Sequence, residues 1–274
     1  MCTKLPIVLC VGCASLLAQP EKTAWDVLKA GFTDKIVDTR RQAVTATGSI
    51  GLDPEALRLI EEALRDQDSL VRQTAAAQLG QMKAKQAIPA LKTALDDATP
   101  EVAFAAAKAL WDIGDKSGRD LLEDVLTGQE KSAEGYFSSA MHDMKRKMHD
   151  PKALAVMGIK EAQGAVLGPF NMGVVAAENA LKDGSGGGKA IAATLLAQDC
   201  DAETYRLLVW SCTNDKNWAV KAASAKALGQ CGKPDAIPTL EQNLADSHAA
   251  TRMMAAGAII KLSEKRTAAG GSGR

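Results

Sequence analysis

One feature constrains the fold of this chain more than any other, because the chain repeats itself. The stretch LGQMKAKQAIPAL at 79–91 returns as LGQCGKPDAIPTL at 228–240, with seven of thirteen letters identical. A period of about 31 or 32 residues predicts stacked units that bury a continuous core only against their neighbours. One interval is longer, with 86 residues between Leu110 and Leu196. The equivalent apolar positions are Thr47, Leu79, Leu110, Leu196, Leu228 and Ile259.

Each unit is predicted to be a helical hairpin. Pro54, Pro89 and Pro238 stand near the starts of the first helices, where the missing N–H of proline has no cost. Aromatic residues make up only 4% of the chain, which suits close-packed helices better than strands. We therefore expect an all-α fold, an α-solenoid of about seven stacked hairpins with one inserted helix. Segments with apolar residues three or four apart, typical of such first helices, are 54–66, 87–97, 118–128, 202–215 and 236–246.

The long interval predicts an insertion. A weaker unit, LAVMGIKEAQGAVLG, fits at 154–168, and about 22 surplus residues then fall at 129–150. We expect a single solenoid over 21–266 that contains this insertion. The glycine-rich end, 267–274, is expected to be a disordered tail.

The first twenty residues differ from the rest. Lys4 precedes an apolar run over 5–17 that is too short to span a bilayer, and small and polar residues follow it. This pattern predicts a removable signal peptide over 1–20 and an exported bacterial protein, periplasmic or extracellular. A lipid anchor on Cys13 fits less well, because Cys10 stands where leucine is expected, and a buried first helix remains the alternative. No other stretch has the apolar length of a transmembrane helix.

Export would leave three cysteines in the mature chain, which is not a disulfide framework. Cys200 precedes the first helix of one hairpin, and Cys231 ends the second. Antiparallel helices bring those ends together, so the two are candidates for a disulfide if their Cα atoms approach within about 6.8 Å. Cys212 lies on an apolar helical stripe and is expected in the core.

The LG pair after an alanine-rich helix, the AIPAL or AIPTL that follows, and the basic residue that opens the second helix (Arg72, Lys221, Arg252) together resemble HEAT repeats. The short period resembles the form called PBS-lyase HEAT-like. This resemblance implies a curved stack whose second helices line the concave face. Some relatives attach or remove bilin pigments and most are interaction scaffolds, so a bilin or tetrapyrrole lyase, or a subunit of one, is the alternative function that the resemblance implies.

Catalytic and metal-binding patterns are absent from the sequence. It contains no GxSxG elbow, P-loop, Rossmann glycine pattern or paired CxxC. His142 and His149 would lie about 10 Å apart along one helix, which is too far for a single metal ion. The 33 basic and 33 acidic residues balance, so no net field favours nucleic acid. We expect a non-enzymatic monomer with no cofactor, no metal and no nucleic-acid partner.

The insertion is the candidate binding site, because insertions in repeat arrays often project from the binding face. Met141, Met144 and Met148 form an apolar stripe, so the alternative is a solvated helix that covers a seam. We expect a scaffold that binds a protein or peptide through its concave face and this insertion. The candidate binding residues are His142, Lys145, Arg146, Lys147, His149 and Lys152.

Two further patterns concern side chains that recur or are large. Trp210 and Trp218 are expected in the core, with an exposed binding role as the alternative. A basic and an acidic residue each recur at one position of the repeat and are expected to form a structural ladder of hydrogen bonds. These residues are Arg72, Lys221 and Arg252 on one side, and Asp66, Asp97 and Asp246 on the other.

Overall fold

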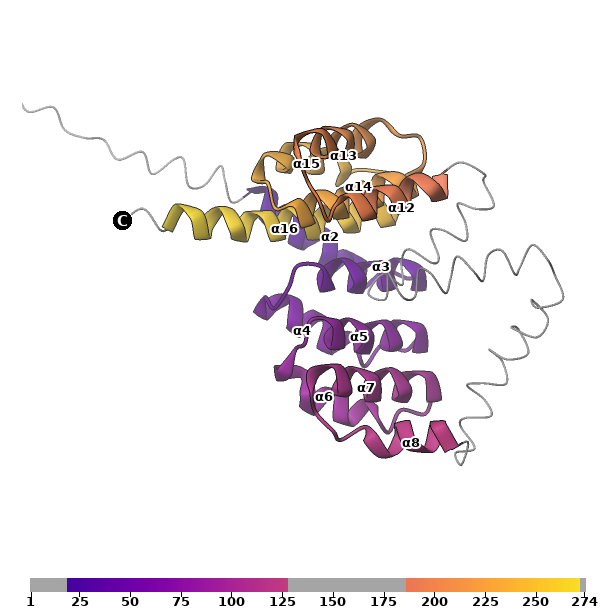
Figure 1. The fold of residues 1–274 in the computed structure, drawn as a ribbon. Coiled ribbons are helices and arrows are strands. Elements are labelled where there is room, and N and C mark those ends of the chain that lie inside the picture. Colours follow the sequence, from indigo (N-terminus) through magenta and orange to yellow (C-terminus); the bar gives the residue numbers. More distant parts are fainter. Residues whose placement is uncertain (1–18, 128–185, 272–274) are drawn as a thin grey trace, which may run out of the picture.

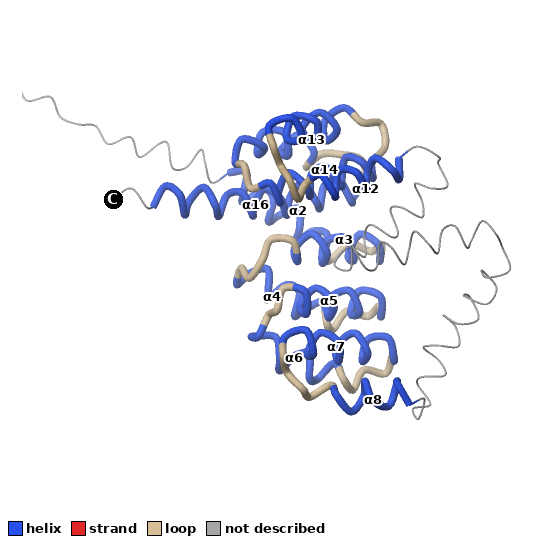
Figure 2. Tube along the Cα trace, in the orientation of Figure 1, coloured by secondary structure: helices blue, strands red, loops and turns tan. Residues whose placement is uncertain are grey.

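The structure is a computed structural model that describes residues 19–127 and 186–271, and this part of the chain contains helices and no strands (Figures 1 and 2). The all-α solenoid prediction is confirmed. The N-terminal helices are α2 (Gln19–Phe32), α3 (Val37–Gly48), α4 (Pro54–Ala63), α5 (Ser69–Gln81), α6 (Ile88–Ala94), α7 (Pro100–Ile113) and α8 (Arg119–Thr127). The C-terminal helices are α12 (Gly186–Leu196), α13 (Ala202–Asn214), α14 (Trp218–Cys231), α15 (Ile237–Asn243) and α16 (Ala249–Gly271). Short 3₁₀ turns, η1 (Lys85–Ala87) and η2 (Pro234–Ala236), precede α6 and α15.

Local sequence signals explain where the helices begin. The side chains of Asp53, Asp68, Asp201 and Asn217 each accept a hydrogen bond from a backbone N–H in the first turn of the helix that follows. These caps satisfy donors that the helix itself leaves unpaired. The prolines predicted at helix starts occupy the first or second position of α4, α6 and α15. Hairpins then form because α4, α6, α13 and α15 pack against the helices that follow them.

Close approach between second helices explains why the sequence is rich in alanine and glycine. A Cβ added at Gly80 of α5 would lie 2.7 Å from Ala109 Cα of α7, and one at Gly229 of α14 would lie 2.8 Å from Ala258 Cβ of α16. Neither site has room for a methyl group. Interiors are close-packed, so small residues at these positions set the spacing of the stack.

The order of the stack differs from the order of the chain. A constant period suggests that the repeats stack in the order of the chain. Instead, the C-terminal helix α16 packs against α2 and α3, the N-terminal hairpin. The second helices therefore follow one another in space as α12, α14, α16, α3, α5 and α7, and Figure 1 shows α3, α5 and α7 one below another beneath α16. Both ends of the described chain thus lie in the middle of the stack.

The junction between α16 and the N-terminal hairpin is as tight as the others. A Cβ at Gly257 would lie 2.7 Å from the carbonyl oxygen of Ala46 in α3. Lys261 Nζ donates to the carbonyl oxygen of Ser49 at 3.0 Å, across 212 residues of sequence. Ala24, Leu28, Ala43 and Ala46 share one hydrophobic cluster with the α16 residues Met253, Met254, Ile259 and Leu262. The two parts of the chain consequently share a core.

Several expected boundaries can be compared with the structure. Helix α16 continues to Gly271, whereas a disordered tail was expected from 267 onward; Ala268 and Ala269, which favour helix, carry it to the final glycines. Helix α2 begins at Gln19, two residues before the expected start of the solenoid. The expected signal segment up to 18, the insertion at 129–150 and the weaker unit at 154–168 lie outside the described residues.

Candidate partner-binding face

The six second helices of the described chain form a continuous surface, which we call the second-helix face. Consecutive helices along it (α12, α14, α16, α3, α5 and α7) are in contact, so the face extends through the whole described stack. One position near the C-terminal end of each of these helices, or in the turn just after it, carries a polar or charged residue that is at least partly exposed. In spatial order these residues are Gln198, Gln230, Lys261, Ser49, Gln81 and Asp112.

Three lysines gather at the middle of this face. Lys226 belongs to α14, and Lys261 and Lys265 lie one helical turn apart on α16. Burial and, to a smaller extent, the positive charge of Lys261 together lower the pKa of Lys226 to about 8. Burial also lowers the pKa of Lys261, with a second contribution from the charge of Lys265. Lys226 and Lys265 therefore each lie close enough to Lys261 for like charges to repel, and this places positive charge where α14 packs on α16.

One acidic side chain of α16, Glu264, accompanies this cluster. Burial raises the pKa of Glu264, as do the negative charges of Asp53 and Glu21, whereas the charge of Lys261 lowers it. Those acidic neighbours place Glu264 toward the starts of α4 and α2. Glu264 therefore lies between the lysines and the acidic residues at the starts of α4 and α2.

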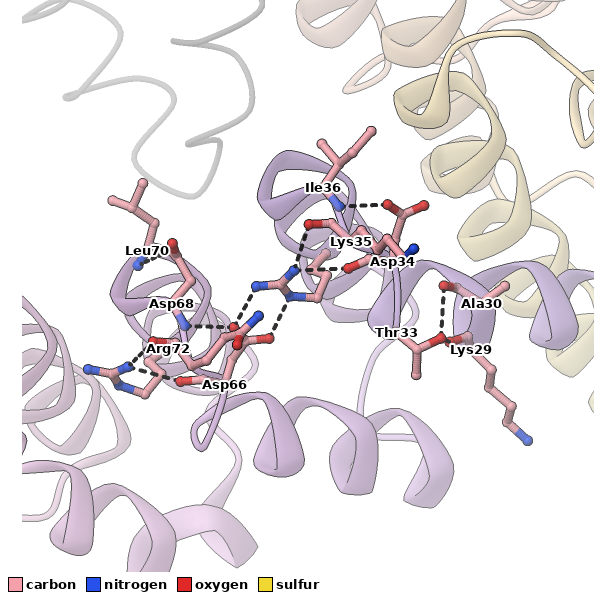
Figure 3. Close-up of polar contacts among 12 residues, drawn as sticks. Lys29, Ala30, Thr33, Asp34, Lys35, Ile36, Asp66, Asp68, Leu70 and Arg72 are labelled. Atoms are coloured by element: carbon pink, nitrogen blue, oxygen red, sulfur yellow. Dashed lines mark hydrogen bonds and ion pairs between the residues drawn. The ribbon is translucent and has the colours of Figure 1, made fainter.

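The recurring acids and bases form the expected ladder beside this face. Arg72 donates from Nε and an amino group to the two carboxylate oxygens of Asp97, at 2.7 and 2.9 Å. Its other amino group donates to the carbonyl oxygen of Asp66 at 2.9 Å, as Figure 3 shows. The same link from one repeat to the next joins Arg40 to Asp66, Lys221 to Asp246 and Lys189 to Asp215. The ladder prediction is confirmed for Arg72–Asp97 and Lys221–Asp246, whereas Arg40, Lys189 and Asp215 were not among the predicted residues.

Arg252 forms no ion pair with an acidic residue of the next repeat among the described residues, although the ladder prediction included it. Arg252 donates to the carbonyl oxygens of Asp246 and Ser247, at 2.8 and 2.9 Å, as Arg72 does within its own repeat. The repeat stacked on it is the N-terminal hairpin, where the equivalent acid is Asp34, and no ion pair joins these two described residues. The prediction was wrong at this position because α16 stacks on the N-terminal hairpin, so the constant spacing that brings Arg72 to Asp97 does not apply there.

The candidate disulfide between Cys200 and Cys231 and the expected burial of Cys212 both concern the α13–α14 hairpin. Cys200 and Cys231 are joined in a disulfide in the structure, with their Cα atoms 5.6 Å apart. Lys233 lies beside this bridge and donates from Nζ to the carbonyl oxygen of Cys200 at 3.2 Å. Cys212 is buried, and burial raises the pKa of its thiol to about 12, so it is a core residue and not a thiolate at neutral pH.

The two tryptophans of this hairpin differ. Trp218 is half-buried and stacks on the imidazole of His248, with ring centroids 5.6 Å apart. Trp210 is 57% exposed, so its expected place in the core was wrong. The buried stripe of α13 consists of Thr204, Leu208 and Cys212, and Trp210 lies on another side of the helix.

The candidate binding residues of the insertion (His142, Lys145, Arg146, Lys147, His149 and Lys152) lie outside the described residues, so their role stays a prediction. The lysine cluster of α14 and α16 was not predicted. Its members come from consecutive repeats, but Lys226 and Lys261 occupy different positions of their repeats, so no recurring position marked them. Among the described residues, no group of three or more His, Cys, Asp or Glu could hold a metal ion. No helix in the same part of the chain is long and apolar enough to cross a membrane.

These hairpins, their glycine and alanine contacts and their acid–base ladder define the chain as an α-solenoid. The chain belongs to the HEAT-repeat family, whose model matches residues 58–133 and 175–261, more than half of its length. Among solved structures, human deoxyhypusine hydroxylase in complex with glycerol is 19% identical, with 92% of this chain and 99% of that one covered and a TM-score of 0.34. Comparison with curated proteins gives no match.

Proposed function

We propose that this protein is an exported, non-catalytic scaffold that binds an acidic segment of a partner protein along its second-helix face. The observation that carries the proposal is the cluster of Lys226, Lys261 and Lys265 at the middle of that face. Stacked repeats create an extended surface suited to a long peptide or a protein edge. A group of lysines on such a surface favours partners that present Asp, Glu or a carboxyl terminus.

Two other features support parts of this proposal. The Cys200–Cys231 disulfide agrees with export, because disulfides persist in oxidising compartments and are rare in the cytosol. The buried thiol of Cys212, with its pKa of about 12, agrees with binding and not with thiol catalysis.

The binding proposal is tested by panning short random peptides displayed on phage against the purified mature protein. We expect the selected peptides to be rich in Asp and Glu, and their affinity to fall with rising salt. The double variant Lys261→Gln/Lys265→Gln should bind them about tenfold more weakly, which corresponds to about 1.4 kcal/mol. The matched control, Lys22→Gln/Lys85→Gln, removes the same charge from exposed lysines of α2 and η1, outside the second-helix face. Equal weakening by both variants, or selected peptides without acidic residues, would contradict the proposal.

Export has its own test. Residues 1–20 are fused to alkaline phosphatase, which becomes active only outside the bacterial cytosol. We expect activity from this fusion and none when the apolar run over 5–17 is interrupted by two aspartates. An inactive fusion would leave the scaffold in the cytosol and would remove this part of the proposal.

A further inference from the structure

Two large apolar side chains lie exposed on one side of helix α13. Leu207 is 53% exposed and Trp210 is 57% exposed. They are three residues apart on the helix, so they are neighbours on its surface. We call this pair the α13 patch. The core contacts of α13 are made by Leu208 and Cys212, so the patch is not needed to anchor the helix.

Comparison with the other first helices shows that the repeat does not require apolar residues here. The recurring aspartate at the end of each first helix gives the alignment: Asp66, Asp97, Asp215 and Asp246. Leu207 and Trp210 lie eight and five residues before Asp215. The residues at the same two positions are Arg58 and Glu61 in α4, Pro89 and Lys92 in α6, and Pro238 and Glu241 in α15. An exposed Leu–Trp pair therefore replaces charged residues and prolines at this one repeat.

The other exposed large apolar residues of the described chain do not form a comparable pair. Trp111 is covered on one face by the ammonium group of Lys116, 3.4 Å from the ring centroid. Single exposed apolar side chains are ordinary in soluble proteins, whereas tryptophan beside leucine on one surface is typical of binding hot spots. The remaining exposed large apolar residues are Ile36 and Leu52 in turns, Leu70 in the first turn of α5, and Leu195 and Leu196 at the end of α12. The residues that precede α12 lie outside the described ranges.

Acidic side chains border the α13 patch. Glu203 is exposed one turn before Leu207 on α13. Helix α15 is the first helix that packs beside α13, and its exposed Glu241 occupies the position equivalent to Trp210. Equivalent positions of stacked repeats lie side by side, so Glu241 stands next to the patch. The edge of the patch toward α15 is thus negatively charged.

Basic side chains near the patch are directed elsewhere or lie at its ends. The Nε of Arg206 donates to the carbonyl oxygen of Ala202 at 3.2 Å, within α13 itself. Lys233 lies over the ring of Tyr205, with Nζ 4.8 Å from the centroid, and Lys216 lies in the turn after the helix. The edge that carries Glu241 therefore keeps its negative charge.

We propose that the α13 patch is a second docking surface, which takes a partner-protein segment that presents aliphatic or aromatic side chains next to lysine or arginine. The apolar side chains would cover Leu207 and Trp210, and the basic ones would face Glu203 and Glu241. This surface lies on the first helices, so it does not depend on the second-helix face. With both faces occupied, the scaffold would hold an acidic and a basic segment at the same time.

The test uses the purified mature protein and peptides selected from the same phage library. We expect a second family of peptides, with apolar and basic residues, that shifts tryptophan fluorescence on binding. The double variant Leu207→Gln/Trp210→Gln should bind this family about thirtyfold more weakly, as expected for a hot spot worth about 2 kcal/mol. The matched control is Ile36→Gln/Leu70→Gln, which changes two residues of comparable exposure and should bind normally. Equal melting temperatures would show that both variants fold.

The outcomes separate this inference from the function proposed above. The variant Lys261→Gln/Lys265→Gln should retain binding of the apolar and basic family, and Leu207→Gln/Trp210→Gln should retain binding of acidic peptides. The inference is overturned if no such family is selected, or if its peptides bind the α13 variant as well as the wild type. It is also overturned if sedimentation shows a self-associated dimer that the α13 variant abolishes, because the occupant would then be a second copy of this chain.

Discussion

The contact between α16 and α3 makes a sharp prediction at Gly257. A Cβ at this position would lie 2.7 Å from the carbonyl oxygen of Ala46 and 3.3 Å from Ser49 Oγ. The carbonyl oxygen of Ala46 already accepts hydrogen bonds from the backbone N–H of Ser49, at 3.1 Å, and from Ser49 Oγ, at 2.6 Å. It cannot move away without straining both bonds, so the helices must separate by several tenths of an ångström.

The expected magnitude follows from two opposing effects. Alanine in place of glycine inside a free helix stabilises it by about 1 kcal/mol. Overpacking a tight site costs about 1 to 3 kcal/mol. We expect Gly257→Ala to lower the free energy of unfolding by about 1 kcal/mol and Gly257→Leu to lower it by about 3 kcal/mol or more. Urea titration followed by circular dichroism measures both.

The matched control is Gly80→Ala, at the equivalent kind of contact between α5 and α7. These helices belong to repeats that are consecutive in sequence, so Gly80→Ala should be destabilising whatever the order of the rest of the stack. If Gly257→Ala were instead as stable as the wild type, or more stable, while Gly80→Ala lost stability, α16 would not lie against α3. The spatial order of the repeats described above would then be wrong.

Three further predictions concern stability. Asp97→Asn should cost about 2 kcal/mol, the value of hydrogen bonds to a charged partner. Because the hydrogen bonds of Arg72 hold the pKa of Asp97 below its ordinary value, this difference should be complete above the unfolded pKa and vanish as the pH falls through the folded pKa, as urea unfolding at several pH values will show. Cys200→Ser/Cys231→Ser should lose about 4 kcal/mol, since the bridge closes a loop with a sequence separation of 31, and a reducing agent should destabilise the wild type but not the variant. Burial lowers the pKa of Lys226 from its ordinary 10.5 to about 8, so stability should rise with pH between these values in the wild type and less in Lys226→Met.

Much of the repeat itself was predictable from the sequence. The prolines at helix starts and the periodic apolar residues act within one hairpin, and their effect depends only on neighbours a few residues away. The pairs Arg72–Asp97 and Lys221–Asp246 join adjacent repeats, so their constant spacing in sequence becomes a constant contact in space. The candidate bridge between Cys200 and Cys231 also followed from the ends of a single hairpin.

Features that depend on side-chain exposure were harder to predict. Trp210 fits an apolar helical pattern as well as Leu208 does, yet only Leu208 is buried. Comparison of its position across the first helices would have been a usable signal, because the charged residues Glu61, Lys92 and Glu241 stand there in α4, α6 and α15. The lysine cluster had no such signal, since Lys226 and Lys261 occupy different positions of their repeats.

The sequence by itself determined the helical hairpin, its period and the ladder between successive repeats, because these rest on contacts within a repeat or with the next one along the chain. Only the tertiary structure decided which repeats are neighbours at the ends of the chain. Every repeat presents similar apolar faces on both sides, so the C-terminal repeat can stack on the N-terminal one as well as on its predecessor. That choice buries Gly257 against Ala46, leaves Arg252 without its rung and places Lys226, Lys261 and Lys265 at the middle of the second-helix face.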